Sequence, residues 1–384
     1  NLASIESILG DKDKAEKLYE QAIQVDNKLV AAWINLINLY LGRNKINEAE
    51  IRINDAILIF PNNFNFYFLD SKISFLKGNL NHTEESLKKT LNLNNQFLPA
   101  LLALGDLLKE KKQYEEAMTY AEKIIKLSPD DSSGYYLCGT LLILQDKLCE
   151  AEEKFRKSIQ LNKSSFEINL YFSVLLRNLD KFDEAEIYGK AAIHLNESSF
   201  MAHYNLGMIF VKLRKFEFAK TSLEKSVTLN PNYLHSNLNL GVVLQDLRYL
   251  QESEDYLLKA LKIKPDCAEA MCNLCSCLRV QKRFEESEKI IFKAIELNPD
   301  LLEAYVNLGS LYFDLGKTKE ALNATRHAIE IDSKSVQAYS NLAVMLQSIK
   351  RFDEAEVSLR KSLEIEPKHL DSILNLGSLL LSRC

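Results

Sequence analysis

The sequence has no apolar run of the length that a membrane span requires. A transmembrane helix needs about 20 predominantly apolar residues in succession, and polar residues interrupt every hydrophobic stretch before that length is reached. The seven cysteines, an odd number in a chain of 384 residues, do not fit the disulfide framework of a small secreted protein. We therefore expect a chain without a membrane segment, in a reducing, cytoplasmic compartment.

Glycine, proline and excess positive charge are also scarce. The 12 glycines and 7 prolines are too few for a turn-rich β protein. The formal net charge of -5 lacks the surplus of Lys and Arg on which non-specific nucleic-acid binding depends. Hydrophobic residues are abundant, at 47% of the chain, which suffices for a large core. The composition predicts a helical protein that does not bind nucleic acid.

A small residue recurs every 34 residues along the whole chain, with no insertion. A small side chain at a fixed phase allows two helices to approach each other closely. The members of this column are Ala15, Ala49, Thr83, Ala117, Ala151, Ala185, Ala219, Ser253, Ser287, Ala321 and Ala355.

Other residue types keep the same period. Aliphatic columns start at Ile23 and Val25 and recur without a break to Leu363 and Ile365. Proline cannot continue a helix interior, so a proline column marks the turn after a helix. The prolines on one phase are Pro61, Pro129, Pro231, Pro265, Pro299 and Pro367, and the glycines on another are Gly105, Gly139, Gly207, Gly241, Gly309 and Gly377.

Residues 302–335 illustrate one repeat. Apolar residues at helical spacing predict a first helix over Leu302–Asp314, Gly316 marks a turn, and a second helix follows over Lys319–Ile331. Neither helix buries its apolar stripe alone, so stacked neighbours must supply the core. We predict an all-α fold, a right-handed superhelical solenoid of antiparallel helix pairs. A single array fills 1–384, with ten full repeats over 30–369 and partial repeats at 1–29 and 370–384.

The two ends of the array lack the polar caps that such arrays need. The chain begins within a helix at Asn1, and its last predicted helix carries apolar residues with no partner helix before Cys384. Those residues are Ile373, Leu376, Leu379 and Leu380. We expect a fragment of a longer protein that self-associates through its uncapped ends.

The residues of this repeat resemble the tetratricopeptide repeat. The similarity rests on Ala304-Tyr305-x-Asn307-Leu308-Gly309-x-x-Tyr312, then on the small residues at Gly316, Ala321 and Ala328, with the terminal proline supplied by neighbouring repeats. Departures gather in 64–97, where Asp70 takes an apolar phase and Thr83 and Thr90 take alanine phases. We expect that repeat to be looser, or to meet something outside the array.

Position 6 of each repeat, with Leu302 as position 1, lies on the face opposite the apolar stripe. In a right-handed stack this face of the first helices lines the concave groove. Asparagine takes position 6 in eight of twelve units, namely Asn1, Asn35, Asn205, Asn239, Asn273, Asn307, Asn341 and Asn375. An amide pairs with both the N–H and the C=O of an extended peptide, so the last six asparagines form a candidate peptide-binding row. Equally, each amide can tie down local backbone.

Position 2, one turn earlier on the same face, carries Glu269, Glu303 and Asp371. These carboxylates either favour Ser, Thr or basic groups in a bound polypeptide or form a solvated rim. In the first half of the array position 6 is instead Leu69, Ala103, Leu137 and Tyr171, with Phe68 and Tyr136 beside them. That stretch either accepts a hydrophobic segment or packs between adjacent repeats.

Among tetratricopeptide proteins the array resembles the repeat region of O-linked N-acetylglucosamine transferases, and related bacterial repeat proteins. The resemblance implies that the asparagines from Asn205 to Asn375, with Glu269, Glu303 and Asp371, hold a substrate polypeptide. The pattern departs from that family because most of the acids are Glu, and His235 and Gln337 interrupt them. The lysine at position 5 that a carboxylate clamp for chaperone tails requires is absent.

No residue pattern indicates catalysis, a metal or a cofactor. The cluster Cys267, Cys272, Cys275 and Cys277 fits small buried thiols better than a zinc site. Two functions remain: a scaffold that binds other proteins or extended peptides, or the substrate-recognition region of a larger enzyme, most plausibly a protein O-glycosyltransferase. RNA recognition by helical repeats is disfavoured, because the chain is acidic and the asparagine row is too uniform for a code. The chain itself is not expected to be an enzyme.

Overall fold

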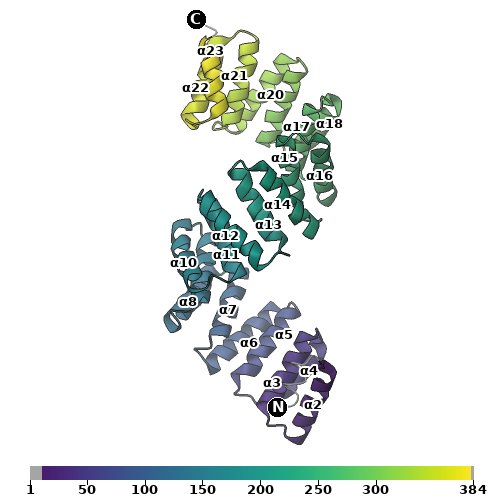
Figure 1. The fold of residues 1–384 in the computed structure, drawn as a ribbon, viewed down its shortest axis with the longest axis vertical. Coiled ribbons are helices and arrows are strands. Elements are labelled where there is room, and N and C mark those ends of the chain that lie inside the picture. Colours follow the sequence, from purple (N-terminus) through teal and green to yellow (C-terminus); the bar gives the residue numbers. More distant parts are fainter. Residues whose placement is uncertain (1–10, 382–384) are drawn as a thin grey trace. The chain divides into compact units, whose positions relative to one another are not determined.

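The computed structural model describes residues 11–381, and every regular element in this range is an α-helix. The chain forms two compact units, Asn1–Lys181 and Phe182–Cys384. Figure 1 shows the helices following one another in chain order, from purple and blue in the first unit to green and yellow in the second. Asn1 and Cys384 lie outside the described residues.

The first unit contains α2 (Lys12–Val25), α3 (Val30–Gly42), α4 (Ile46–Ile59), α5 (Phe64–Leu76), α6 (Leu80–Leu93), α7 (Leu98–Glu110), α8 (Tyr114–Leu127), α9 (Ser132–Leu144), α10 (Leu148–Leu161) and α11 (Phe166–Asn178). The second unit contains α12 (Phe182–Leu195), α13 (Phe200–Lys212), α14 (Phe216–Leu229), α15 (Leu234–Asp246), α16 (Leu250–Ile263), α17 (Ala268–Val280), α18 (Phe284–Leu297), α19 (Leu302–Asp314), α20 (Thr318–Ile331), α21 (Val336–Ser348), α22 (Phe352–Ile365) and α23 (Leu370–Leu381).

The predicted helix pairs are confirmed nearly to the residue. Helix α19 spans Leu302–Asp314 as expected, and α20 begins at Thr318, one residue before the prediction. The earlier start arises because Lys317 is the N-cap, and its carbonyl accepts the first helical bond from the N–H of Ala321. In the text below, odd-numbered helices from α3 to α23 are called first helices and even-numbered ones second helices.

The column of small residues is buried at each repeat, as close helix packing requires. Its alanines are fully inaccessible, and Thr83, Ser253 and Ser287 are buried as well. The glycine column serves the same packing inside a repeat. A Cβ built on Gly241 in α15 would lie only 2.7 Å from Cγ of Leu257 in α16. The small residues that recur every 34 positions therefore mark the points of closest contact between consecutive helices.

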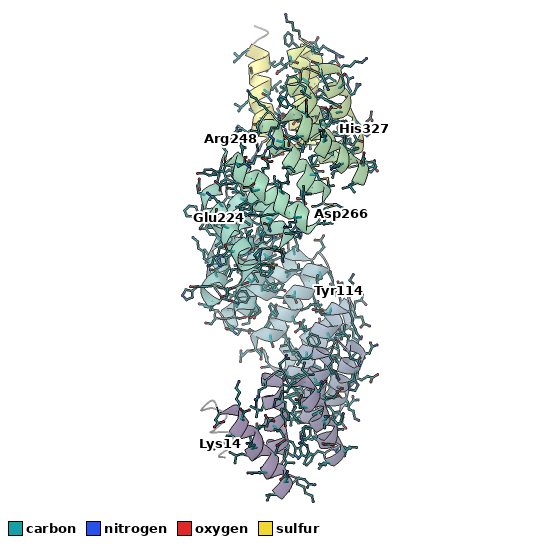
Figure 2. The ribbon with its side chains drawn as sticks, turned by 90° about the vertical axis from the view of Figure 1, so that its right-hand side faces the viewer. Lys14, Tyr114, Glu224, Arg248, Asp266 and His327 are labelled. Atoms are coloured by element: carbon teal, nitrogen blue, oxygen red, sulfur yellow. The ribbon has the colours of Figure 1, made fainter. Side chains whose placement is uncertain are left out.

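The turn inside each repeat ends the first helix with one residue in the left-handed conformation. This residue recurs at position 15 with φ between 55° and 75°, and Figure 2 labels one example, Arg248. The next N–H bonds back into the helix, as Lys317 N–H does to the carbonyl of Tyr312 at 2.9 Å. Within residues 11–381 only Gly78 and Gly316 are glycines at this position, although glycine suits it best.

The turn between repeats, where Figure 2 labels Asp266, is stabilised by two recurrent hydrogen bonds. In the first, an Asn or Asp just after the second helix accepts from the N–H two residues on, as Asn298 does from Asp300. In the second, a donor at position 4 of the next first helix reaches back six residues to a carbonyl. Those donors are Trp33, Tyr67, Asn169, His203 and Asn237.

An ion-pair ladder joins neighbouring repeats. A glutamate at position 21, on the second helix, pairs with a Lys or Arg at position 14 or 16 of the following repeat. The pairs are Glu16–Lys45, Glu50–Lys77, Glu84–Lys111, Glu152–Lys181, Glu186–Lys215, Glu254–Arg283 and Glu288–Lys317. Hydrogen bonds from Lys111 and Lys88 lower the pKa of Glu84, which shows that the carboxylate is stabilised in its charged form.

First and second helices are not equivalent within a unit. Consecutive first helices approach each other directly, from α13 through α23 in the second unit and at α3–α5, α7–α9 and α9–α11 in the first. No comparable approach joins consecutive second helices in the described part of the chain. The first helices are therefore the more closely spaced row, so each unit curves with its first helices on the inner wall.

The divergent repeat 64–97 buries polar groups that find partners inside the repeat. Asp70 is 8% exposed, and its Oδ2 accepts from Ser86 Oγ at 2.5 Å and lies 3.0 Å from His82 Nε2. The hydroxyl of Thr83 donates to the carbonyl of Asn79, the N-cap of α6, and that of Thr90 donates to the carbonyl of Ser86 one turn earlier in α6. Helices α5 and α6 are thus joined by a buried carboxylate–hydroxyl hydrogen bond, at a phase where the other repeats carry an apolar residue.

The last described helix, α23, is only partly covered. Leu379 is buried and Leu376 packs beside it, whereas Ile373 and Leu380 are more than 40% exposed. The predicted self-association through this end remains a prediction.

Candidate polypeptide-binding groove

The second unit places all of the predicted groove residues on its row of first helices. Position 6 contributes Asn205 on α13, Asn239 on α15, Asn273 on α17, Asn307 on α19, Asn341 on α21 and Asn375 on α23. The acids of position 2 are Glu269 on α17, Glu303 on α19 and Asp371 on α23. Because these first helices are consecutive neighbours, the sequence column becomes a row across the inner wall of one unit.

The six amides are not equivalent, because several are already engaged within the scaffold. The Nδ2 of Asn307 donates to the carbonyl of Cys272 on α17 at 3.0 Å, and that of Asn239 donates to His235 in its own helix at 2.8 Å. Asn341 Nδ2 donates to Ser310 Oγ on α19 at 3.2 Å. Asn205 is 2% exposed. The amides of Asn239, Asn307 and Asn341 therefore stabilise the scaffold itself, and burial keeps Asn205 from a ligand.

Asn273 and Asn375 differ from the other four asparagines. Both are half-buried, and neither side-chain amide makes a hydrogen bond within the described residues. An amide that is partly accessible and has no internal partner retains two donors and an acceptor for a ligand. These two positions are therefore the strongest candidates in the row for contact with a bound peptide.

The position 2 acids are exposed and form no ion pair with any residue that the structure describes. Glu269, Glu303 and Asp371 lie at the start of their helices, open to solvent. Further along the same face, Arg279 on α17 and Asp314 on α19 neutralise each other at 2.6 Å. Among the exposed charges of this face without an ion pair in the described residues, the three acids outnumber Lys212 of α13, so the balance is negative and favours a ligand with basic or hydroxyl groups.

In the first unit the aromatic residues pack between adjacent repeats. The rings of Tyr136 on α9 and Tyr171 on α11 lie 5.7 Å apart, and Phe68 meets Phe97 edge to face at 5.1 Å. Burial raises the pKa of the Tyr136 hydroxyl well above its ordinary value. Leu69 and Leu137 are buried in the core. Ala103 instead lines a pocket among α3, α5, α6 and α7.

The cysteine cluster consists of packed thiols. Cys272, Cys275 and Cys277 are buried, with Cys275 Sγ 3.1 Å from Ser287 Oγ and Cys277 Sγ donating to the Leu250 carbonyl. Burial raises the pKa of Cys272 to about 12. Across residues 11–381 no group of His, Cys, Asp and Glu side chains has an arrangement suited to hold a metal ion.

A hollow in the first unit lies between α8, α9 and α10. It has a volume of about 1430 Å³, and mixed charges such as Glu122, Lys126 and Lys154 line its second-helix walls. Opposite charges at close spacing leave it without a preference for a ligand of either charge.

None of the helices in the described range combines the length and apolarity that crossing a bilayer demands.

Comparison with known proteins identifies the repeat. Four family models, each described as tetratricopeptide repeat, match residues 9–67, 266–334 and 335–365, and a further set at 98–131, 202–233 and 234–267. Together they cover more than half of the chain. The unmatched stretches include residues 68–97, where the polar interior of the divergent repeat lies.

Several known proteins resemble parts of the sequence. A TPR repeat-containing protein of Methanocaldococcus jannaschii is 28% identical over 157 residues, 40% of this chain and 27% of that protein. Human protein O-mannosyl-transferase TMTC3 is 28% identical over 171 residues, 43% of this chain and 18% of the transferase. The type IV pilus assembly protein PilF of Pseudomonas aeruginosa is 33% identical over 150 residues, 38% and 58% of the two chains. The match thus spans less than two thirds of each relative.

Solved structures agree on the fold. The crystal structure of the APC/C hetero-tetramer Cut9-Hcn1 aligns over 99% of this chain and 89% of its own, with a TM-score of 0.54 and 13% identity. A tetratricopeptide repeat protein of Parabacteroides merdae aligns over 65% of this chain and 98% of its own, with a TM-score of 0.60 and 15% identity. The 34-residue helix pairs, the family models and these structures agree: the chain belongs to the tetratricopeptide repeat family.

Proposed function

We propose that this protein is a binding scaffold whose second unit holds extended segments of other proteins along the inner face of its first helices. The observation that carries the proposal is the row of asparagines on six consecutive first helices, with unpaired acids one turn away. The likeness to a repeat protein solved within a hetero-tetramer supports a role in protein assembly. We further propose a reducing, cytoplasmic location, where the described cysteines, all free thiols, stay reduced.

The chemistry of the row favours recognition of the peptide backbone. Asn273 and Asn375 offer donors and acceptors to the N–H and C=O groups that every peptide carries, and such pairing is largely independent of side chains. Glu269, Glu303 and Asp371 add a preference for Lys, Arg, Ser or Thr. The expected ligand is an extended, polar to basic polypeptide.

Fluorescence anisotropy with a labelled peptide of Ser, Thr, Lys and Gly residues tests this proposal. A neutral hydrogen bond contributes roughly 0.5–1.5 kcal/mol, so Asn273→Ala and Asn375→Ala are each expected to weaken binding by about two- to tenfold. Asn239→Ala is the matched control, since its amide already donates to His235 in its own helix. It is expected to change affinity less.

A second peptide isolates the backbone contribution. Methylation of its backbone amides removes the N–H donors but keeps its side chains, so we expect it to bind more weakly than the parent peptide. Equal binding of the two peptides, together with unchanged affinity in Asn273→Ala and Asn375→Ala, would rule out the amide row as the binding site. Failure of the unmethylated peptide to bind at all would rule out the proposed ligand class.

A second candidate function is the substrate-recognition region of a protein O-glycosyltransferase. It is favoured by the match to human protein O-mannosyl-transferase TMTC3 and by the acids beside the amide row, which suit Ser- and Thr-rich segments. The coding sequence beyond Cys384 tests it. A catalytic domain with nucleotide-sugar or lipid-sugar features would support this function, and a short polar capping helix followed by a stop codon would favour the free-standing scaffold.

A further inference from the structure

The first unit contains an apolar pocket along its row of first helices. The pocket has a volume of about 520 Å³ and lies among α3, α5 and α7, with Thr83 and Leu87 of α6 contributing to its lining. It is found where α5 and α7 make fewer close approaches than any other consecutive pair of first helices in this unit. Ala103, at the phase that carries Leu69 and Leu137 in adjacent repeats, leaves the space between these two helices unfilled.

The walls of the pocket are mainly apolar and face solvent. Leu41, Phe68, Phe75 and Leu76 line it. Phe75 and Leu76 are each 54% exposed, an unusual position for adjacent large apolar residues. Sites that bind ligands are typically roughly 300–1,000 Å³, apolar, and rimmed by a few polar groups. The volume here accommodates two neighbouring apolar side chains of a ligand.

The charges around the pocket indicate the sign of the ligand. Lys72 lies over the ring of Phe68, with its ammonium 4.6 Å from the ring centroid. On the opposite wall Asp106 pairs with Lys109 at 2.6 Å, and Glu110 is exposed and has no ion pair within residues 11–381. Two accessible charges of the lining thus lack an ion pair among the described residues: the ammonium of Lys72 on α5, which lies over the Phe68 ring, and the carboxylate of Glu110 on α7. The Glu110 carboxylate makes the α7 end of the pocket the place for a cationic side chain of a ligand.

From this apolar pocket with an unpaired carboxylate at its α7 end, we propose that the first unit binds a partner protein through a segment that inserts neighbouring leucine or phenylalanine side chains and carries Lys or Arg beside them. The proposal extends the scaffold function to a second site of different chemistry. It rests on that function only in assigning a polypeptide as ligand. The polar amide row in the second unit and the apolar pocket in the first then recognise distinct segments.

The test uses the full chain and a short labelled peptide in which leucines at helical spacing are followed by lysines. Two reference peptides accompany it, one with the leucines replaced by serine and one with the lysines replaced by glutamate. Fluorescence anisotropy is expected to show binding of the leucine–lysine peptide, at least about tenfold weaker binding of the serine peptide, and a loss of about three- to tenfold for the glutamate peptide at low salt.

Two substitutions locate the site. Ala103→Leu fills the pocket with a side chain that the chain already carries at this phase in neighbouring repeats, and Glu110→Lys reverses the unpaired charge. Both are expected to weaken binding of the leucine–lysine peptide by about three- to tenfold or more. The matched controls are Ala31→Leu, at an exposed position of α3 outside the pocket, and Glu115→Lys, at an exposed position of α8. These controls are expected to bind the peptide as the wild type does.

The outcomes separate this proposal from the scaffold function. Loss of binding in Ala103→Leu and Glu110→Lys, with retention in both controls and in Asn273→Ala, supports the pocket. Unchanged binding in Ala103→Leu, or equal binding of the serine peptide, overturns it. Loss of the leucine–lysine peptide in Asn273→Ala alone places the ligand in the second unit, which overturns the pocket proposal and leaves the scaffold function standing. Circular dichroism confirms that each variant is folded.

Discussion

Gly241→Ala probes the close contact between the two helices of a repeat. A Cβ at this position would lie 2.7 Å from Cγ of Leu257 and 3.3 Å from the backbone carbonyl oxygen of Ser253. Both distances are tighter than ordinary van der Waals contact, and the second involves backbone that moves only with its helix. Leu257 is fully buried, so its side chain has no free volume into which to rotate.

Two opposing contributions set the size of the effect. Replacement of glycine by alanine within a helix gains about 1 kcal/mol of helix propensity. Overpacking of a well-packed core costs about 1–3 kcal/mol, and the rigid surroundings of Gly241 place the cost near the upper end. We therefore expect Gly241→Ala to destabilise its repeat by about 2 kcal/mol.

Gly377→Ala is the matched control, because it occupies the same phase in α23 and nothing lies within 4 Å of its built Cβ. There only the propensity gain remains, so the substitution is expected to be neutral or stabilising by up to about 1 kcal/mol. Repeat arrays do not unfold as one two-state unit, so hydrogen exchange read by mass spectrometry is the suitable assay. Faster exchange in α15 and α16 is the expected result for Gly241→Ala. Unchanged or slower exchange there would refute the argument from the Cβ contacts.

Three further predictions concern single side chains. Gly316→Ala places a Cβ at φ 73° and is expected to cost about 1 kcal/mol, measured as faster hydrogen exchange in α19 and α20. Burial raises the pKa of Glu152, but hydrogen bonds from Lys181 and Arg156 outweigh this effect, so the net shift is downward from 4.5. Its stabilising contribution, roughly 1 kcal/mol or less, is therefore present above about pH 4.5 and lost as the pH falls through the folded pKa. Glu152→Gln should be less stable than wild type at pH 7 and equal to it at low pH, whereas the exposed neighbour Glu153→Gln should match wild type at both; the same deficit at low pH would contradict the assignment. Alkylation at pH 8 should label exposed Cys149 and leave Cys272, with its pKa raised to about 12 by burial, unmodified until the chain unfolds; rapid labelling of Cys272 would count against its burial.

The fold was predictable because its determinants are periodic. The small residue typified by Ala321 and the glycine typified by Gly309 occupy contact points that recur every 34 residues, so one repeat explains the others. The helix boundaries followed from the same phase. The left-handed residue at position 15 was visible only where it is glycine, as at Gly316, because Lys282 and Arg248 hold the same conformation without a sequence signal.

The candidate site was predictable only in part. The helical phase placed the asparagines on the inner face, but it did not distinguish Asn307, whose amide bonds to the neighbouring helix, from Asn273, whose amide does not. That difference depends on side-chain rotamers and on the distance between two helices, which a residue column does not encode. The only sign of the pocket in the sequence was the small side chain of Ala103 at position 6, where the adjacent repeats carry leucine. Its charged rim required Asp106 and Glu110, at positions 9 and 13, to be read together with the separation of α5 from α7.

The ion-pair ladder has a consequence for how such a gene changes length. Across the junction, each glutamate at position 21 pairs with a cation at position 14 or 16 of the next repeat, as Glu50–Lys77 and Glu254–Arg283 illustrate. Deletion or duplication of a whole repeat whose junctions carry such pairs places the position 21 glutamate of one repeat beside the position 14 or 16 cation of its new neighbour. The new junction is then bridged by an ion pair of the same kind. Unequal recombination between repeats thus alters the reach of the scaffold in whole steps without creating an unfamiliar interface. Selection on ligand length is then separated from selection on stability.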